Sequence, residues 1–413
     1  MKMRILSIGD IADVLPGYAF KSSQYSSDGI KLLRGVNVSP ESIDWSDCAF
    51  WRKADGDGLD NYILQNEDIV IGMDRPWISS GFRIARVGDN DLPSLLVQRV
   101  ARLRTRQGHN QRYLYYILCA SAFQSHLKNL HTETTVPHIS HKDIESFKVE
   151  MPALSEQRRI ADILDKADAI RRKRKQAIAL TDQLLRSTFL EMFGDPVTNP
   201  KGWPEIQLSK IADVSSGVAK GKNYEGVATV SVPYMRVANV QDGYLDMKEI
   251  KTIEVAEEEA RRYQLSAGDI LLTEGGDPDK LGRGAVWNGE INPCIHQNHI
   301  FRVRSTEQCL PEFLSALLGS ERGKRYFLRA AKQTTGIASI NMTQLRAFPV
   351  FIPAMGAQMR YRECVSLISN IKQRLSLSFS AADDLFSSLA YRAFRSELSL
   401  PEQDTGQLSM FNK

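Results

Sequence analysis

The sequence predicts an α+β protein made by tandem duplication, with two globular domains separated by two long antiparallel coiled-coil helices. Three observations predict this fold class. Residues 154–193 and 353–398 each carry a seven-residue hydrophobic repeat, the pattern of a helix that buries one continuous seam. The segments before these two helices share motifs at an offset that stays within two residues of 200. Each of those segments, at about 150 residues, has the length of an ordinary domain.

The first long helix is expected over 154–194, as a rod of about 60 Å at about 1.5 Å per residue. Ser155 stands at the expected N-cap, Gly194 supplies the left-handed position that ends a helix, and Pro196 prevents its resumption. A helix of this length with one apolar seam requires a partner helix. The predicted seam residues are Ile160, Ile163, Ala167, Ile170, Leu184 and Leu185.

The second long helix, 353–398, is the expected partner. Its predicted seam residues are Val365, Ile368, Leu375, Phe379, Phe386 and Leu389. The second globular domain joins the end of the first helix to the start of the second, so the simplest packing is antiparallel. We therefore expect the helices to form a fixed spacer that relates the two globular domains by a pseudo-twofold axis. DNA presents the same groove about every 34 Å, and a spacer of this length suits a bipartite DNA site.

The globular domains are expected over 1–153 and 195–352, followed at the C-terminus by a flexible tail over 399–413. Ile11-Ala12-Asp13-Val14 with Gly17 recurs as Ile211-Ala212-Asp213-Val214 with Gly217, and Arg102-x-Arg104 recurs as Arg302-x-Arg304. Short β-type runs separated by Gly, Pro, Asn and Asp clusters predict strands. The strands expected in the first domain are 30–38, 68–71, 82–87 and 95–103, with one helix over 113–130 and its counterpart over 311–331.

Composition indicates a cytoplasmic protein. The five cysteines have no CxxC spacing, so we expect reduced thiols rather than disulfides or a zinc site; they are Cys48, Cys119, Cys294, Cys309 and Cys364. No apolar run is long enough to span a bilayer, and the N-terminus lacks the layout of a signal peptide. The net charge is only +4, and neither globular domain is basic overall, so charge alone leaves DNA binding open. The basic run Arg171 to Lys175 could equally contact phosphates, solvent or an acidic partner.

Three groups of motifs occur at the ends of the two long helices. They are Met151-Pro152 with Leu154-x-Glu156-Gln157-x-x-Ile160; Leu190-Glu191-Met192-Phe193-Gly194-Asp195-Pro196 with Asn199-Pro200-Lys201-Gly202-Trp203-Pro204; and Leu385-Phe386-x-Ser388-Leu389 with Arg392-Ala393-Phe394. With these motifs, the chain resembles the specificity (S) subunit of type I restriction–modification systems over essentially its whole length. The second helix departs from the pattern, because it opens Met355-Gly356-Ala357-Gln358 without the Leu and Glu of the first.

The resemblance implies two target-recognition domains joined by two helical conserved regions. Each domain would read one half of a split site in double-stranded DNA. The helices would dock two methyltransferase (M) subunits, and restriction (R) subunits would add cleavage. S-adenosylmethionine, ATP and Mg²⁺ are then expected on those partner subunits and not on this chain, and no membrane is involved.

The sequence contains no motif for catalysis. It has no Asn-Pro-Pro-Tyr or Asp-Pro-Pro-Tyr for a flipped adenine, no glycine loop for S-adenosylmethionine and no P-loop. The run Asp277-Pro278-Asp279-Lys280 could open a nuclease carboxylate set, but no Glu-x-Lys follows at strand spacing, which favours a turn. We therefore expect no catalytic residue, metal ligand or cofactor site on this chain, and do not expect it to be the enzyme.

What remains is DNA readout, for which Arg reads guanine, Asn or Gln reads adenine, and Lys, Ser and Thr hold phosphates. Candidates in the first domain are Arg34, Asn37, Arg75, Trp77, Arg99, Thr134, Thr135, His138 and His141. Candidates in the second domain are Lys220, Lys222, Tyr224, Arg236, Asn239, Asp277, Lys280, Arg283, Asn298, Thr334 and Thr335. Asn37 and Asn239 recur in both halves, so they could equally be structural turn residues. Base readers should differ between halves, which favours Arg75-Pro76-Trp77 and Asp277-Pro278-Asp279-Lys280.

Two alternatives remain open. The chain could be the DNA-reading subunit of a methylation-only defence system, which the sequence does not distinguish from a restriction system. It could also be a coiled-coil scaffold with no nucleic-acid role. Salt separates the last two classes, because a DNA reader loses affinity steeply as ionic strength rises, whereas a scaffold shows no retention on DNA at low salt.

Overall fold

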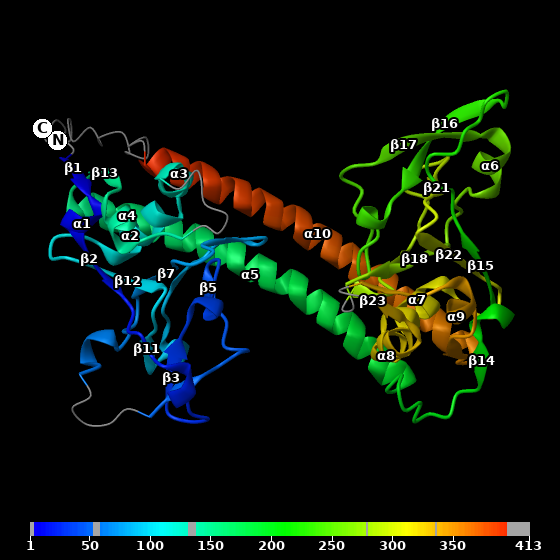
Figure 1. Ribbon diagram of the computed structural model, residues 1–413, viewed down its shortest axis with the longest axis horizontal. Helices are drawn as coiled ribbons and strands as arrows, with labels where there is room; N and C mark the ends of the chain where they lie inside the picture. The colour runs from blue at the N-terminus through cyan, green and yellow to red at the C-terminus, as the bar shows by residue number, and fades with distance from the viewer. Residues whose placement is uncertain (1–3, 53–57, 131–137, 278–279, 335–336, 395–413) are drawn as a thin grey trace, which may run out of the picture. The chain divides into compact units, whose positions relative to one another are not determined.

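The structure is a computed structural model in which residues 4–52, 58–130, 138–277, 280–334 and 337–394 are described. The chain divides into two compact units: unit 1 comprises residues 1–174 with 378–413, and unit 2 comprises residues 175–377. Each unit contains one globular domain and one half of each long helix, α5 (Leu154–Phe193) and α10 (Met355–Phe394) (Figure 1). The end of the second helix predicted over 395–398 and the tail over 399–413 lie outside the described residues.

An antiparallel sheet of four strands forms the centre of unit 1, in the order β10–β7–β12–β2. These strands are β2 (Ala12–Pro16), β7 (Ile69–Gly72), β10 (Ile84–Arg86) and β12 (Val100–Thr105). Side chains of the sheet share one buried core with helices α2 (Gln111–Cys119) and α3 (Ser121–Leu130). The single helix predicted over 113–130 is therefore two helices, because Ala120 has an extended backbone (φ −66°, ψ 149°) that ends α2.

Smaller elements complete unit 1. A second sheet has the order β11–β3–β6, with β11 parallel to β3, and three two-stranded sheets pair β1 with β13, β4 with β5, and β8 with β9. The elements are β1 (Arg4–Ser7), α1 (Ile8–Ile11), β3 (Ile30–Leu33), β4 (Val38–Ser39), β5 (Ser42–Ile43), β6 (Phe50–Trp51), β8 (Trp77–Ile78), β9 (Gly81–Phe82), β11 (Ser94–Leu96), α4 (His141–Glu145) and β13 (Lys148–Met151).

Unit 2 repeats this plan. Its central antiparallel sheet has the order β15–β22–β18–β20, the counterpart of β2–β12–β7–β10, and it shares a core with α7 and α8. Ser320 is extended (φ −72°, ψ 173°), so the helix predicted over 311–331 is also two. The elements are β14 (Glu205–Gln207), β15 (Ala212–Ser216), β16 (Thr229–Met235), β17 (Lys251–Ala256), α6 (Glu257–Arg262), β18 (Ile270–Thr273), β19 (Gly275–Gly276), β20 (Gly284–Val286), β21 (Ile295–His296), β22 (Ile300–Ser305), α7 (Pro311–Gly319), α8 (Glu321–Ala330), β23 (Lys332–Thr334), β24 (Ile337–Ser339), α9 (Met342–Arg346) and β25 (Pro349–Phe351).

The repeated Arg-x-Arg motif makes the same ion pairs in both units. The pairs are Arg102–Asp13 (2.6 Å) and Arg104–Asp68 (2.5 Å) in unit 1, and Arg302–Asp213 (2.7 Å) and Arg304–Asp269 (2.6 Å) in unit 2. Asp68 and Asp269 are buried, so these arginines neutralise carboxylates at the edge of the core. The sequence repeat is thus a repeat of contacts, which confirms the duplication.

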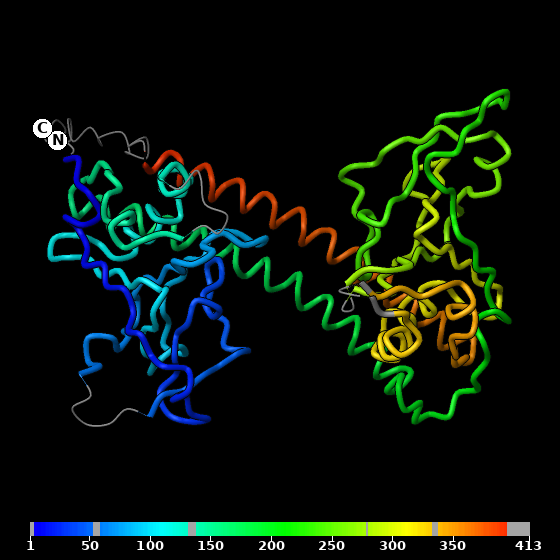
Figure 2. The backbone as a smooth tube through the Cα atoms, in the orientation of Figure 1, coloured from blue at the N-terminus to red at the C-terminus, as the bar shows by residue number. Residues whose placement is uncertain are grey.

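The two long helices pack antiparallel within each unit. In unit 1 the first half of α5 meets the last half of α10, where Arg174 Nη1 donates to the Ser378 carbonyl at 2.6 Å. In unit 2 the last half of α5 meets the first half of α10, where Lys372 Nζ lies 2.5 Å from Asp182 Oδ1. The trace in Figure 2 shows the same pairing, with the start of α5 beside the red end of α10. The predicted antiparallel packing is confirmed within both units.

The predicted seam of α5 is wrong at two positions. Ile170 and Leu184 are 49% and 51% exposed, so these two assignments were wrong, whereas Ile160, Ile163, Ala167 and Leu185 are buried or half-buried as predicted. Leu164, Arg171 and Leu185 are turned inward at heptad spacing, and Arg171 takes the place expected of Ile170. The predicted seam residues of α10 are all buried or half-buried. The helix also begins at Leu154, so Ser155 is not the N-cap, whereas Gly194 adopts the predicted left-handed φ of +86°.

A buried ionic cluster explains why Arg171 replaces Ile170 in the seam. Its guanidinium binds Asp168 (2.7 Å), Glu41 (2.6 Å) and Asp383 (3.3 Å), and it lies 4.7 Å from the ring of Phe386. Burial alone would lower the pKa of Arg171, but its hydrogen bonds to Glu41 and Asp168 raise it overall, so the charge is retained. The aliphatic stem packs in the seam while the charged end is satisfied by three segments. The start of the basic run Arg171 to Lys175 is thus structural.

Unit 2 joins its domain to the long helices through a cluster of aromatic side chains. Four aromatic rings, Phe189 and Phe193 of α5, Phe313 of α7 and Tyr361 of α10, lie with centroids 4.8–5.9 Å apart. Such a cluster is stabilised mainly by apolar burial and edge-to-face geometry. Unit 1 has aromatic contacts of the same kind, since Tyr113 and Tyr116 of α2 lie 5.9 Å from Phe394 and Phe386 of α10, so what distinguishes unit 1 is the added ionic cluster at Arg171.

Candidate nucleic-acid interface

The predicted candidates Arg34 and Asn37 lock a turn in unit 1. Asn37 is 1% exposed; its Oδ1 accepts from the Arg34 amide, and its Nδ2 donates to the carbonyls of Asp44 and Asp47, both at 2.8 Å. The Arg34 guanidinium binds Asp47. Every hydrogen-bonding group of the Asn37 amide is thus engaged inside the domain, and it has no surface with which to read a base.

Arg236 and Asn239 form the same turn in unit 2. Asn239 is 3% exposed, its Oδ1 accepts from the Arg236 amide at 3.0 Å, and its Nδ2 donates to the carbonyls of Asp246 and Glu249. Arg236 Nη2 binds Glu249. The side-chain amides of both asparagines are engaged inside the domains, which supports the alternative of a structural turn for both.

Two candidate side chains of unit 1, Arg99 and His138, bind one carboxylate just after β7, and a third candidate, Arg75, is next to it in the chain. Asp74 binds Arg99 Nη1 through one oxygen at 2.9 Å and His138 Nδ1 through the other at 2.5 Å. Arg75 follows directly and is exposed. Arg75 and Arg99 have φ of +45° and +70°, a region that non-glycine residues rarely adopt. Strained residues of this kind cluster at functional sites, so this Asp74 cluster is the strongest base-reading candidate in unit 1.

The remaining described candidates of unit 1 are less accessible for contact with DNA. The ring of Trp77 packs beside Phe82 with centroids 5.5 Å apart, and its Nε1 donates to Gln124 at 3.4 Å. Lys128 Nζ covers the same ring at 5.3 Å. His141 opens α4 and is half-buried. Trp77 thus completes the edge of the core, whereas its neighbour Arg75 faces solvent.

In unit 2, three candidates lie in the segment before β16. Lys222 forms an ion pair with Glu259 of α6, and the Tyr224 hydroxyl donates to the same carboxylate at 2.6 Å. The hydrogen bond from Lys222, followed by that from Tyr224, lowers the pKa of Glu259. Lys220 Nζ lies 5.3 Å from the centre of the Tyr234 ring. Lys220 and Lys222 form an exposed basic group whose positive charge is partly balanced by Glu259.

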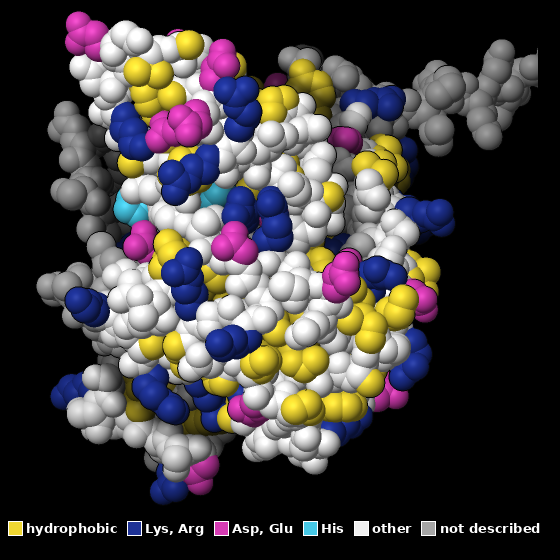
Figure 3. Space-filling model, turned by 90° about the vertical axis from the view of Figure 1, so that its right-hand side faces the viewer, with side chains coloured by type: hydrophobic (Ala, Val, Ile, Leu, Met, Phe, Trp, Pro, Cys, Tyr) yellow, Lys and Arg dark blue, Asp and Glu magenta, His cyan; other side chains and the backbone are white. Residues whose placement is uncertain are grey.

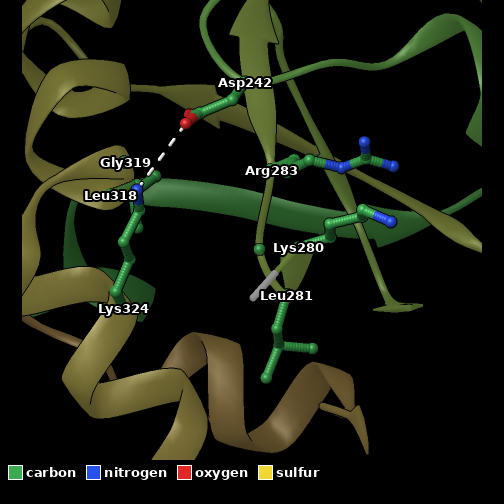
Figure 4. A pocket seen from close by; sticks show the side chains of 8 residues that line it. Asp242, Lys280, Leu281, Arg283, Leu318, Gly319 and Lys324 are labelled. Carbon is green, nitrogen blue, oxygen red and sulfur yellow. Dashed lines mark ion pairs between the residues drawn. The ribbon is translucent and has the colours of Figure 1, made fainter. Parts of the chain in front are cut away.

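A second group of basic side chains in unit 2 lines a hollow of about 170 Å³ between the β19–β20 loop and the start of α8 (Figure 4). Lys280 and Arg283 extend in the same direction from this loop, while Lys324 turns toward Asp242 at 3.6 Å. Arg283 Nη1 donates to Gln241 at 3.0 Å. The Lys280 ammonium pairs with Asp277 and thereby lowers the pKa of that exposed carboxyl. This loop is the counterpart of the segment that carries Arg75.

The sequence missed one pair in unit 2 that resembles the Asp74 cluster. His299 Nδ1 lies 2.7 Å from Glu274 Oε2 at the end of β18, and the imidazole is 58% exposed. The neighbouring candidate Asn298 is half-buried. Its backbone amide donates to the Val218 carbonyl, and its backbone carbonyl accepts from the Ser216 hydroxyl. A sign was present in the sequence: the spacing from Gln98 to Arg102 grows by one residue between Gln297 and Arg302.

Three candidates, Thr134, Thr135 and Thr335, lie outside the described residues, and Thr334 is placed only as the last residue of strand β23. On the face drawn in Figure 3, lysine and arginine side chains are dispersed among acidic and hydrophobic ones. The described surface on that face therefore carries local basic groups rather than one continuous basic field. DNA contact in this molecule has to rest on such local groups.

The repeated domain itself decides the family. The family model for the type I restriction modification DNA specificity domain matches residues 2–180 and matches again at residues 200–375. The chain belongs to this family. Two specificity domains in tandem account for the duplicated sheets, the duplicated ion pairs and the two long helices.

Some relatives in the specificity-domain family match nearly the whole chain, and others match only a part of it. The type I restriction enzyme EcoKI specificity subunit of Escherichia coli (strain K12) is 21% identical over 95% of this chain and 89% of its own length. The EcoAI specificity subunit of Escherichia coli is 35% identical, but over only 38% of this chain and 27% of that protein. The crystal structure of the type I restriction–modification system S subunit from M. genitalium has a TM-score of 0.54 at 13% identity, covering 95% of this chain and 96% of that one. That structural likeness extends the shared fold to nearly the whole chain.

Other sequence-based expectations concern the whole molecule. All five cysteines are free thiols. Within the described ranges, no group of His, Cys, Asp or Glu is arranged to hold a metal ion. Nor does any described helix have the length and apolar character to cross a membrane.

The second specificity domain contains a buried histidine whose titration gives a test of the fold. His296 is fully buried, and burial, followed by the positive charge of Arg302, lowers its pKa from 6.5 to about 4. The unfolded chain binds a proton at this residue below pH 6.5, whereas the folded chain does not until about pH 4. We therefore expect the unfolding free energy to fall between those pH values by up to about 3 kcal/mol from this residue alone.

His296→Leu gives the matched comparison, because Leu96 holds the equivalent place in the first domain. Leu96 pairs with Leu33 as His296 pairs with Met235, and the carbonyls of Leu96 and His296 accept from the amides of Tyr18 and Val218. The stability of the leucine variant should depend less steeply on pH between 6.5 and 4, as measured by urea unfolding at each pH. Parallel curves for the two proteins would show that His296 is protonated in the fold.

Proposed function

We propose that this chain is the specificity subunit of a type I restriction–modification complex. Each specificity domain reads one half of a bipartite site in double-stranded DNA. The observation that carries the proposal is the tandem duplication of the specificity domain, with shared contacts inside and different exposed side chains at equivalent strand ends. Arg75 with Arg99 in unit 1, and Lys280 with His299 in unit 2, give the two domains different chemistry for the bases.

We further propose that the long helices dock two methyltransferase subunits, to which restriction subunits add. Large apolar side chains remain exposed along both helices; they are Ile170, Leu180, Leu184 and Leu190 on α5, and Met359, Leu367, Ile371, Leu377, Leu385 and Tyr391 on α10. Exposed apolar side chains at this density are typical of a surface that another protein covers. In this proposal the chain is not itself an enzyme. S-adenosylmethionine, ATP and Mg²⁺ bind the partner subunits, and the complex acts on DNA in the cytoplasm.

The test is to express the chain with its cognate methyltransferase subunits and map methylated bases across a bacterial genome. We expect a split motif with a gap of fixed length, methylated on both strands. Replacing residues 1–152 by the matching domain of another specificity subunit should change only one half of the motif. A continuous motif, or no motif, would favour the scaffold instead. Methylation without cleavage when no restriction subunit is encoded nearby would identify a methylation-only system.

A further inference from the structure

One turn occupies the same place in both units and carries a different charged side chain in each. Arg99 directly precedes Val100 at the start of β12, and His299 directly precedes Ile300 at the start of β22. The Arg99 carbonyl accepts from the Met73 amide at 2.8 Å, and the His299 carbonyl accepts from the Glu274 amide at 3.0 Å. The strand pairing thus makes Arg99 and His299 equivalent, although the sequence spacing around them differs by one residue.

Both side chains are exposed and are held by a carboxylate from the neighbouring strand end. Arg99 is 69% exposed and pairs with Asp74 at 2.9 Å; His299 is 58% exposed and pairs with Glu274 at 2.7 Å. The carboxylates come from non-equivalent positions, since Glu274 corresponds to Met73. Each unit therefore has the same arrangement built from different residues. An exposed guanidinium in one unit, and an exposed imidazole in the other, is oriented by a carboxylate. An exposed ion pair adds little to stability, so stability does not explain why both units have one.

The backbone conformation of Arg99 also indicates that its side chain has a function. Its φ of +70° lies in the left-handed region, which glycine adopts at lower cost. A glycine would suit this turn, yet the chain carries a long cation there and ties it to Asp74. Strain that is retained at an exposed turn indicates that the side chain is used.

From this geometry we propose that Arg99 and His299 are the equivalent specificity-determining residues of the two units, each reading a base in its half-site. The proposal rests on the function proposed above. Arg99 has the fork that binds guanine O6 and N7, while His299 presents a single ring nitrogen and selects a different edge pattern. Asp74 and Glu274 are positioning residues that orient the Arg99 guanidinium and the His299 imidazole. The units thus read unlike half-sites from one shared position.

The experiment uses the full chain in complex with its methyltransferase subunits and maps the methylated motif for single variants. Arg99→Gly should relax one base of one half-site by about tenfold or more and leave the other half unchanged. His299→Ala should relax one base of the opposite half only. Asp74→Asn should relax the same base as Arg99→Gly, which a purely structural carboxylate would not do. Arg99→Gly also removes the strained φ, so its melting temperature should equal or exceed that of the wild type.

Matched controls are Arg52→Ala and Arg261→Ala, which remove exposed arginines paired with Asp28 and Glu257. Both controls should preserve the motif. A wild-type split motif that survives unchanged in Arg99→Gly and His299→Ala would overturn the assignment while leaving the proposed function standing. Loss of all methylation by a folded Arg99→Gly variant would also overturn it, since that result indicates general affinity rather than base choice. If the wild type gives no split motif, the proposed function fails and this inference fails with it.

Discussion

Leu185→Glu is expected to destabilise unit 2 by about 2–4 kcal/mol, whereas Leu184→Glu changes stability by no more than about 0.5 kcal/mol. Leu185 packs against the hydrophobic core of unit 2, and Leu184 is 51% exposed. A glutamate at position 185 would place a carboxylate against the apolar core, where burial disfavours its charge. The same glutamate at position 184 would remain in water.

The two leucines make a closely matched pair, because the substitution, the helix and the change in helix propensity are the same. The measurement is urea unfolding followed by circular dichroism at 222 nm, a wavelength that reports helix content, together with solubility. Equal losses in the two variants, or a larger loss for Leu184→Glu, would contradict the seam seen in the structure. Such a result would restore the register that hydrophobicity alone suggests.

Gly217→Ala should destabilise unit 2 by about 3 kcal/mol or more. A Cβ at this position would lie 2.0 Å from the His296 carbonyl oxygen and 2.6 Å from its carbon. The obstacle is backbone, and it is held in place because the Val218 amide donates to the same carbonyl at 2.9 Å. No side-chain rotation relieves this contact, so the strand end has to move.

Gly356→Ala is the control for that substitution within the same unit. Its new Cβ would lie 3.9 Å from the nearest atom, an Arg360 nitrogen, in helix α10. Alanine favours a helix over glycine by about 1 kcal/mol, so this variant should be as stable as the wild type or more stable. Thermal unfolding of both variants decides the matter, and a wild-type melting temperature for Gly217→Ala would refute the close approach. Gly17, whose Cβ would lie 2.2 Å from the Val97 carbonyl oxygen, should behave in the same way in unit 1.

The candidate interface was only partly predictable. The sequence drew attention to the segment with Arg75 and to Arg99 and His138, and the structure joins Arg99 and His138 at Asp74, the residue before Arg75. It also offered Asn37 and Asn239, with a structural turn as the alternative, and their side-chain amides are engaged in buried turns. Residue type identifies a side chain that is able to read a base. Only the fold shows whether its hydrogen-bonding groups are already engaged.

By itself the sequence determined the duplication, the class of the domains and the extent of the first long helix. The helix predicted over 154–194 is observed as Leu154–Phe193, because a heptad repeat and the terminal Gly194 act locally along the chain. The family could also be assigned, since its motifs are linear. These features depend on neighbours in the sequence.

The tertiary structure alone decided the register of the seam and the pairing of the two turns. Hydrophobicity placed Ile170 inside, but Arg171 occupies the seam because Asp168 of the same helix and the distant residues Glu41 and Asp383 neutralise its charge. Likewise, Arg99 and His299 became equivalent only when the strands β12 and β22 fixed their carbonyls against neighbouring strand ends. In both cases the energy of a residue depends on groups far away in the sequence, which local patterns do not encode.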